Sequence, residues 1–217
     1  MREKAEALAA TLLPLADFVT VIYSNPEEAE EEGTGEWIKV PNEYFFGRKF
    51  REALKRNKGD IFLNIQADAS SSEWEKIFQK CREAYAQIPR LGVWQPNLDW
   101  TWWTTDRVRL GNLTPELAVV AQTDGITFAV NQEVVSRLLE LDYDRNNLGW
   151  GVEWAAIVYA YSHNLLVLRD TSVKVLHPKG SGYDHTEARK QQDAFLDQLS
   201  PQEKLQYFLL YRFVTRT

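Results

Sequence analysis

The order of local patterns along the chain predicts a single α/β domain, with a mostly parallel central sheet flanked by helices and with helices at the C-terminal end. Strand-like and helix-like segments alternate over most of the 217 residues, as they do where crossover helices join parallel strands. Residues 61–65 are almost continuously apolar, which is typical of a strand covered on both faces. No repeat or linker divides the chain, and its length suffices for one sizeable core.

In the first half of the chain, each predicted helix has a recognisable boundary. Residues 2–12 are rich in Ala, Leu and Glu, and a proline follows them. A second helix over residues 43–57 carries apolar side chains at spacings of three and four, and a glycine follows it. Three serines and two glutamates over residues 70–75 predict a capping box at the start of a third helix. The strands predicted between these helices are residues 18–23, 37–40 and 61–65.

The second half of the chain mixes strands, loops and helices. The segment Ser200-Pro201-Gln202-Glu203 combines an N-cap, a proline at the first helical position and a returning glutamate, which predicts the start of the last helix. The predicted strands are residues 92–94, 117–122, 126–130, 165–168 and 173–176, and the predicted helices are residues 131–141, residues 152–163 and two pieces from Asp184 onward.

Composition excludes several classes of protein. The net charge is −6, from 31 acidic and 25 basic residues, so the chain is not expected to bind nucleic acid, which requires a basic surface. The single cysteine, Cys81, cannot form an intramolecular disulfide and suits a reducing compartment. No secretory signal is visible, and the apolar runs are too short for a transmembrane segment. The expected location is cytoplasmic.

Three polar residues stand where a site is expected. Asp68 follows the apolar strand at 61–65, and open α/β sheets bind ligands beyond the carboxyl ends of their strands. Its carboxylate can hold a divalent cation that also binds phosphate oxygens, or it can simply end the strand or cap the next helix. Glu153 begins a helix after two glycines and either serves chemistry or favours the helix dipole. His177 follows a strand and is either a metal ligand or an ordinary surface histidine.

The order of these features resembles that of nucleotide-sugar glycosyltransferases of the GT-A type, especially the large family-two-like group. The shared features are an asparagine, an Ala-Arg-Asn-x-Gly-like segment, an Asp-x-Asp motif that closes a strand, a Gly-Trp-Gly-x-Glu-Asp-like segment and a late histidine. In this sequence they correspond to Asn42, to residues 54–59 with Arg56 and Asn57, to Gln66-Ala67-Asp68, to Gly149-Trp150-Gly151-Val152-Glu153, and to His177.

The resemblance implies one GT-A-like, Rossmann-like domain over residues 1–217. Residues 1–90 would form a nucleotide-binding half, residues 91–183 an acceptor half, and residues 184–217 the C-terminal helices. It further implies a divalent metal, Mn²⁺ or Mg²⁺, and a nucleoside-diphosphate sugar, most simply a UDP-sugar, as donor.

The same resemblance implies a role for each matching residue. Asp68 and His177 would hold the metal, and Glu153 would take the proton from the acceptor hydroxyl. The donor would be bound by Asn42, Arg56, Asn57, Gln66 and Asp68.

The sequence departs from the family pattern in three places. Gln66 replaces the first aspartate of the Asp-x-Asp motif, and Trp154 stands where an aspartate often follows the glutamate. The family's first strand, which helps to form the nucleoside pocket, has no counterpart, so residues 18–23 would be its second strand. These departures favour an alternative function, a non-catalytic protein that binds a nucleotide or nucleotide sugar.

Tryptophans supply the remaining candidates. Trp102, Trp103 and Trp150 are candidates for binding the acceptor, because indole faces pack well against sugar rings. Trp102 and Trp103, with Trp94 and Trp100, can equally form a hydrophobic cluster beneath a long loop. The leading hypothesis is a metal-dependent, inverting glycosyltransferase with an unknown acceptor. A nucleotidyltransferase is less well supported, because residues 1–25 contain no glycine for a phosphate-binding loop.

Overall fold

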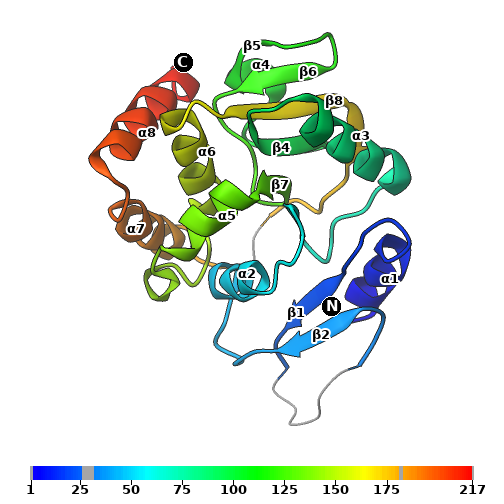
Figure 1. Ribbon diagram of the computed structural model, residues 1–217. Helices are drawn as coiled ribbons and strands as arrows, with labels where there is room; N and C mark the ends of the chain where they lie inside the picture. The colour runs from blue at the N-terminus through cyan, green and yellow to red at the C-terminus, as the bar shows by residue number, and fades with distance from the viewer. Residues whose placement is uncertain (1, 26–31, 181–182, 217) are drawn as a thin grey trace.

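The computed structural model describes residues 2–25, 32–180 and 183–216. They form a mixed α/β domain in which a six-stranded sheet lies between layers of helices, with a separate two-stranded sheet near the N-terminus (Figure 1). This confirms the predicted α/β class, with a central sheet flanked by helices. Within the described ranges, no helix is both long and apolar enough to cross a membrane.

The six-stranded sheet is mixed, and its strand order is β3-β7-β4-β8-β6-β5. The prediction of a mostly parallel sheet is wrong, because among the described strands of this sheet only β4 and β8 pair in parallel. The alternation of strand and helix patterns gives the order of the elements along the chain, but it does not give the direction in which each strand enters the sheet. Four residues join β5 to β6, far fewer than the dozen or so that a parallel crossover needs. The strands are β1 (Thr20–Tyr23), β2 (Glu36–Lys39), β3 (Ile61–Ile65), β4 (Leu91–Leu98), β5 (Arg109–Asn112), β6 (Leu117–Val120), β7 (Thr127–Asn131) and β8 (Leu166–Val175).

The predicted helices are all present in the predicted order, and two short helical elements, α4 and η1, were not predicted. The N-terminal ends of α3 and α8 test the two predicted capping boxes. Ser200 accepts a hydrogen bond from the Glu203 amide while the Glu203 side chain accepts one from the Ser200 amide, so the predicted capping box is present. The capping box predicted over residues 70–75 does not form, because α3 begins after Glu73 without a side-chain cap. The helices are α1 (Arg2–Leu12), α2 (Phe46–Lys55), α3 (Trp74–Gln87), α4 (Thr105–Val108), α5 (Gln132–Leu139), the 3₁₀ turn η1 (Tyr143–Arg145), α6 (Val152–Ser162), α7 (His185–Leu196) and α8 (Pro201–Val214).

Side chains that alternate along the central strands fill two hydrophobic cores, one on each face of the sheet. On β4, Val93 belongs to the core beneath α5, α6 and α8, whereas its neighbour Trp94 belongs to the core beneath α3. Val167 and Leu168 on β8 divide in the same way. This period of two follows from the pleat of a strand, and it explains why central strands read as continuous apolar runs.

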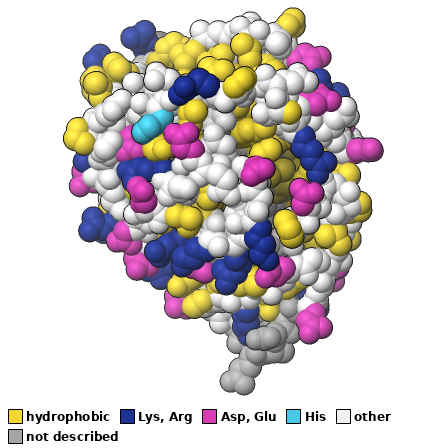
Figure 2. All heavy atoms as spheres, in the orientation of Figure 1, with side chains coloured by type: hydrophobic (Ala, Val, Ile, Leu, Met, Phe, Trp, Pro, Cys, Tyr) yellow, Lys and Arg dark blue, Asp and Glu magenta, His cyan; other side chains and the backbone are white. Residues whose placement is uncertain are grey.

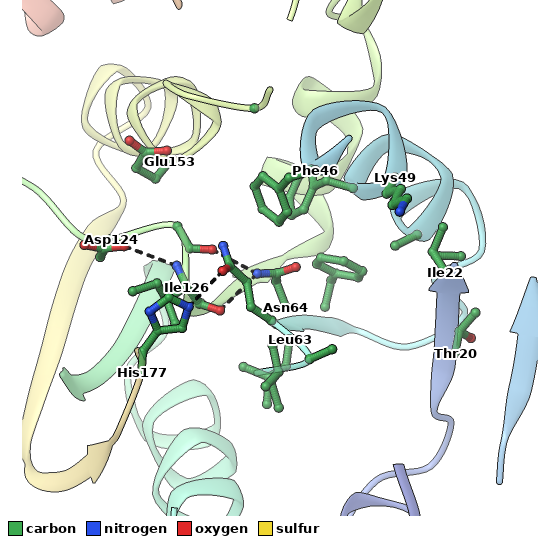
Figure 3. Close-up of a pocket in the computed structure, with 18 of the residues that line it drawn as sticks. Thr20, Ile22, Phe46, Lys49, Leu63, Asn64, Asp124, Ile126, Glu153 and His177 are labelled. Carbon is green, nitrogen blue, oxygen red and sulfur yellow. Dashed lines mark hydrogen bonds between the residues drawn. The ribbon is translucent and has the colours of Figure 1, made fainter. Parts of the chain in front are cut away.

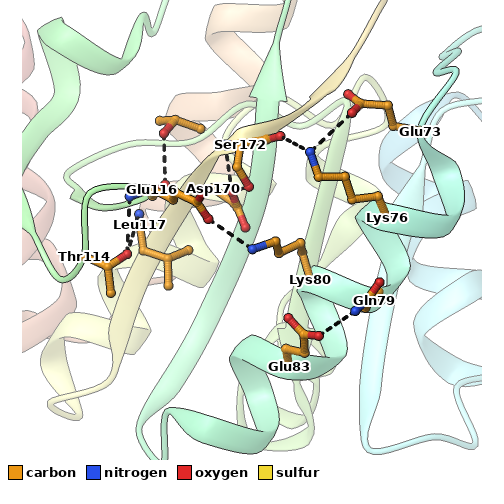
Figure 4. Close-up of polar contacts among 11 residues, drawn as sticks. Glu73, Lys76, Gln79, Lys80, Glu83, Thr114, Glu116, Leu117, Asp170 and Ser172 are labelled. Atoms are coloured by element: carbon orange, nitrogen blue, oxygen red, sulfur yellow. Dashed lines mark hydrogen bonds and ion pairs between the residues drawn. The ribbon is translucent and has the colours of Figure 1, made fainter.

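Polar contacts hold α3 against its face of the sheet (Figure 4). The ammonium of Lys80 lies 3.0 Å from a carboxylate oxygen of Glu116, just before β6. Lys76 donates to the backbone carbonyl of Ser172 on β8 over 2.8 Å. Both contacts are partly exposed, so they orient the helix more than they stabilise it.

Strand β3 is the element that departs most from its sequence pattern. As predicted, side chains on both of its faces meet a core, Phe62 on one face and Ile61, Leu63 and Ile65 on the other. All five of its residues are nevertheless only half-buried. In the described structure β3 lies at the edge of its sheet and pairs with β7 alone. The strands β1 and β2 pair with each other in a separate sheet, so the second edge of β3 faces a cavity rather than another strand (Figure 3).

Candidate functional site

A cavity of about 2150 Å³ reaches from the β1–β2 sheet to the loops that follow β3 and β8. Figure 3 shows Thr20, Ile22 and Lys49 on one side of it, with Asp124, Glu153 and His177 on the other. In Figure 2 this face of the molecule is hollowed, with hydrophobic side chains in the hollow and charges of both signs around it. The cavity is therefore apolar where it borders β1 and polar at its opposite end.

The polar end brings together Asp68 and His177, which are 109 positions apart in the sequence. The Nε2 atom of His177 lies 3.1 Å from Oδ1 of Asp68 and 3.2 Å from Oε1 of Gln66. The cause is a backbone bridge just outside the main sheet, in which Ser70 and Leu176 exchange two hydrogen bonds of 2.9 and 2.7 Å. The end of β3 and the end of β8 are thereby fixed side by side.

The donor atoms of this group suit a hard divalent cation. Asp68 offers a carboxylate oxygen, Gln66 an amide oxygen and His177 an imidazole nitrogen, and ions such as Mn²⁺ accept all three kinds of ligand. Within the described ranges, no three His, Cys, Asp or Glu residues lie close enough together to hold a metal by themselves. A cation here would therefore take its remaining ligands from water or from phosphate oxygens.

Two glycines in the left-handed conformation place Glu153 at the cavity. Gly149 and Gly151 have φ angles of +86° and +87°, which residues with a Cβ adopt at a cost. A Cβ on Gly149 would lie 2.4 Å from Cδ1 of Phe46, so the loop also packs too closely on α2 for any other residue. The turn formed by these glycines starts α6, and Glu153 lies in its first turn.

The carboxyl group of Glu153 is strongly perturbed. Burial, followed by the nearby negative charge of Asp124, raises the pKa of Glu153 to about 8. Its polar neighbour is Gln122, whose Nε2 lies 3.5 Å from Oε1 of Glu153. Below this pKa the side chain is neutral, and near it the side chain can both hold and release a proton.

Asp124 is a site residue that the sequence analysis missed. It lines the cavity from the loop before β7, where it accepts hydrogen bonds from Oγ1 of Thr101 (2.7 Å) and from the Ile126 amide (3.3 Å). Burial raises the pKa of Asp124, although these hydrogen bonds and the charge of Arg169 favour its ionised form. In the sequence the only signal is Asp-Gly before an apolar run, which indicates a turn and nothing more.

A buried arginine holds the Asp124 loop in position. The guanidinium of Arg169 on β8 donates two hydrogen bonds, of 3.2 and 2.8 Å, to Oε1 of Gln95 on β4. Gln95 in turn donates through Nε2 to the carbonyl oxygen of Asp124 over 2.8 Å. Arg169 and Gln95 are both fully buried, so this network fixes the loop from inside the sheet.

The tryptophans predicted to bind a ligand all line the cavity. Trp102 is 69% exposed, whereas Trp103 packs edge-to-face on the buried Trp154. Trp150 donates from Nε1 to the hydroxyl of Tyr183 over 2.7 Å. Trp94 is buried in the core, whereas Trp100, Trp102, Trp103 and Trp150 line the cavity. Acceptor binding by Trp102, Trp103 and Trp150 stays a prediction.

The remaining predicted donor-binding residues divide into two groups. Arg56 and Asn57 line the cavity, but Arg56 already forms an ion pair with Glu52 (3.0 Å) and Asn57 donates to the Gly59 carbonyl (3.0 Å). Asn42 is exposed in the turn between β2 and α2 and does not reach the cavity. The structure therefore brings Gln66, Asp68, Glu153, His177 and the tryptophans to one cavity and leaves Asn42 outside it.

Comparison with known proteins supports the fold without giving a family. No family model matches the sequence, and no curated protein matches it either. Among solved structures, GalNAc-T7 with UDP, GalNAc and Mn²⁺ is similar with a TM-score of 0.56 at 11% identity, over 79% of this chain and 38% of that one. The chain thus spans well under half the length of GalNAc-T7.

Two further structures are less similar. One is a CMP-2-keto-3-deoxy-manno-octonic acid synthetase complexed with CTP, with a TM-score of 0.49 at 16% identity over 90% of this chain and 87% of that one. The other is a UDP-glucose pyrophosphorylase complexed with UDP-glucose, with a TM-score of 0.46 at 8% identity over 77% and 68%. At such identities the likeness to GalNAc-T7 shows the fold alone, and that fold is GT-A-like, as the sequence resemblance implied.

Proposed function

We propose that the protein is a metal-dependent glycosyltransferase that moves a sugar from a nucleoside-diphosphate sugar, most simply a UDP-sugar, to an acceptor hydroxyl. The observation that carries this proposal is the meeting of Asp68 and His177, over 3.1 Å, in the cavity that also holds Glu153. Chain segments that are far apart in sequence supply an oxygen and nitrogen ligand set beside a carboxylate of high pKa. A metal-binding group and a base are the two parts that such a transfer requires.

In this proposal Asp68 and His177 would hold Mn²⁺ or Mg²⁺, with Gln66 as a neutral oxygen ligand. A divalent metal held there would supply positive charge against the charge that develops on the departing diphosphate. Glu153 accepts the proton of the acceptor hydroxyl while its oxygen forms a bond to the anomeric carbon. The bond from that carbon to the phosphate oxygen breaks, and its electron pair leaves with the nucleoside diphosphate. Attack from the face opposite the leaving group inverts the anomeric centre.

The environment of Glu153 suits this role. A base is most effective when its pKa lies near the working pH, and burial raises the pKa of Glu153 to about 8. The two left-handed glycines before α6 fix the direction in which the side chain enters the cavity. The position of Glu153 at the cavity therefore depends on the backbone of this turn.

Calorimetric titration of UDP in the presence and absence of Mn²⁺ tests the proposal. The wild-type protein is expected to bind UDP only with the metal, and Asp68→Ala is expected to lose that binding. Asp106→Ala is the matched control, because this aspartate has a side chain 95% exposed and does not line the cavity. Equal affinity of Asp68→Ala and wild type for UDP with Mn²⁺ would refute the metal assignment.

A second candidate function is a non-catalytic protein that binds a nucleotide or nucleotide sugar. Trp154 favours it, because this residue is buried among Trp103, Tyr207 and Tyr211 and offers no second carboxylate beside Glu153. Turnover distinguishes the two functions. Release of UDP from a UDP-sugar over hours, abolished by Glu153→Gln, supports the transferase, whereas tight binding without release supports the alternative.

A further inference from the structure

We propose that Asp124 recognises the transferred sugar, and that this sugar is neutral and carries free neighbouring hydroxyl groups. The inference rests on the proposed function, since it assigns a task within the same cavity. It concerns a residue that neither the sequence motifs nor the fold comparison marks.

The loop that carries Asp124 lies between the metal-binding pair and Glu153. On one side it is bonded to the end of β3, because the Gln66 amide donates to the Ile126 carbonyl (3.0 Å) and Asn64 donates from Nδ2 to the Gly125 carbonyl (3.1 Å). On its other side, a Cβ placed on Gly125 would lie 3.6 Å from Oε2 of Glu153. A sugar whose diphosphate lies at Asp68 and whose reacting carbon faces Glu153 must therefore pass along Asp124.

The carboxylate of Asp124 has unused hydrogen-bonding capacity. Each of its oxygens accepts one hydrogen bond, from Thr101 at Oδ2 and from the Ile126 amide at Oδ1, although a carboxylate oxygen can accept two. Because the side chain lines the cavity, the two remaining lone pairs are available to a ligand. Two neighbouring hydroxyl groups of a sugar ring supply a matching pair of donors.

The aromatic side of the same subsite is connected to Asp124 through Thr101. This threonine lies between Trp100 and Trp102, and its hydroxyl accepts a hydrogen bond from the Trp103 amide (3.1 Å) while it donates to Asp124. Trp100 and Trp102 pack edge-to-face with ring centroids 5.6 Å apart. Indole faces next to a carboxylate can cover the C–H surface of a sugar while the carboxylate binds its hydroxyls.

The charges around this subsite favour a neutral sugar. Two cations lie over indole rings at this subsite. Arg107, which lines the cavity, lies over Trp103, and Lys179, which does not line it, lies over Trp100. A negatively charged sugar would meet the carboxylate of Asp124, and like charges at close range disfavour binding.

The test is calorimetric titration, with Mn²⁺ present, of UDP, UDP-glucose, UDP-galactose and UDP-glucuronate as probes. In the wild type at least one UDP-hexose is expected to bind more tightly than UDP, and more tightly than UDP-glucuronate. Asp124→Asn keeps the shape but removes the charged acceptor, so its affinity for that UDP-hexose is expected to fall about ten-fold or more. Its affinity for UDP, which lacks the sugar, is expected to stay within about two-fold of wild type.

Two further variants complete the design. The Trp102 side chain is 69% exposed, so Trp102→Ala does not disturb the core. This variant is expected to weaken UDP-hexose binding about three-fold or more and to leave the affinity for UDP unchanged. Asp106→Asn, on a side chain 95% exposed, is the control and is expected to change neither affinity.

The outcomes separate the two proposals. If UDP with Mn²⁺ does not bind the wild type, the proposed function fails and this inference fails with it. If UDP binds but every UDP-hexose binds Asp124→Asn and Trp102→Ala as tightly as the wild type, only the sugar assignment is overturned. Preferential binding of UDP-glucuronate by the wild type would overturn it as well.

Discussion

Replacement of Glu153 by glutamine is expected to make the protein more stable at alkaline pH and to flatten its pH dependence. Burial raises the pKa of Glu153 from 4.5 to about 8, so between these values the folded protein holds a proton that the unfolded chain releases. The contribution of this group to stability is complete below pH 4.5 and is lost as pH rises through about 8. Glutamine resembles the protonated form and has no proton to lose.

The magnitude follows from the two pKa values. At about 1.4 kcal/mol for each tenfold change in proton affinity, the full difference corresponds to about 4 to 5 kcal/mol. Water that reaches the half-buried side chain screens part of this, so we expect Glu153→Gln to exceed the wild type by about 2 to 3 kcal/mol at pH 9. The gain should be near zero at pH 4. Urea unfolding at pH 4, 5, 6, 7, 8 and 9 measures the difference.

Glu116→Gln provides a control of opposite sign. The hydrogen bond and charge of Lys80 lower the pKa of Glu116, so the stability from this group is present at neutral pH and lost in acid, and its removal should produce no gain at pH 9. If Glu153→Gln and wild type differ by the same free energy at every pH, Glu153 does not hold a proton in the folded state. The reasoning about its pKa, and about its role as a base, would then be refuted.

Two further predictions concern stability, and both are checked by urea unfolding at pH 7. Gly149→Ala should cost about 2 to 4 kcal/mol, because this position has a left-handed backbone, which disfavours a Cβ, and because the new Cβ would lie 2.4 Å from Phe46. Gly111→Ala, with no atom within 4 Å of its Cβ, should cost little, and equal costs would contradict the packing argument. Ser200→Ala should cost about 1 kcal/mol through loss of the capping box. Ser72→Ala, before a helix without a side-chain cap, should be nearly neutral, and a larger loss of stability at Ser72 than at Ser200 would contradict this assignment of the caps.

Comparison of the serines before α3 and α8 shows that a capping-box sequence does not by itself ensure that the capping box forms. The same kind of motif precedes α3 and α8, yet only Ser200 forms a capping box. Near α3, Ser71 donates instead to the Lys174 carbonyl on β8 (2.7 Å). The same hydroxyl accepts a hydrogen bond from the Glu73 amide (3.0 Å), so Ser71 joins the start of α3 to β8 instead of forming a capping box. Residues 70–75 alone do not reveal this tertiary contact.

The candidate site also contains residues that the sequence identified and residues that it misplaced or missed. Asp68, Glu153 and His177 were identified from their places at the ends of strands or the start of a helix, in an order similar to that of a known family. Asn42 was identified from that order alone, and the structure leaves it exposed outside the cavity. Asp124 carried only a turn signal, although the structure places it beside Glu153.

The sequence by itself determined most of the strands and helices in their order, and the polar residues at the ends of β3 and β8. These properties depend on residues that are neighbours in the chain. The sequence did not reveal α4 or β5, and it divided β8 into two strands. The tertiary structure alone decided that β7 enters antiparallel between β3 and β4, that β3 is left at an edge, and that the Asp124 loop lies against Glu153. Strand pairing over such distances results from many weak contacts acting together, and no short segment of sequence contains that sum.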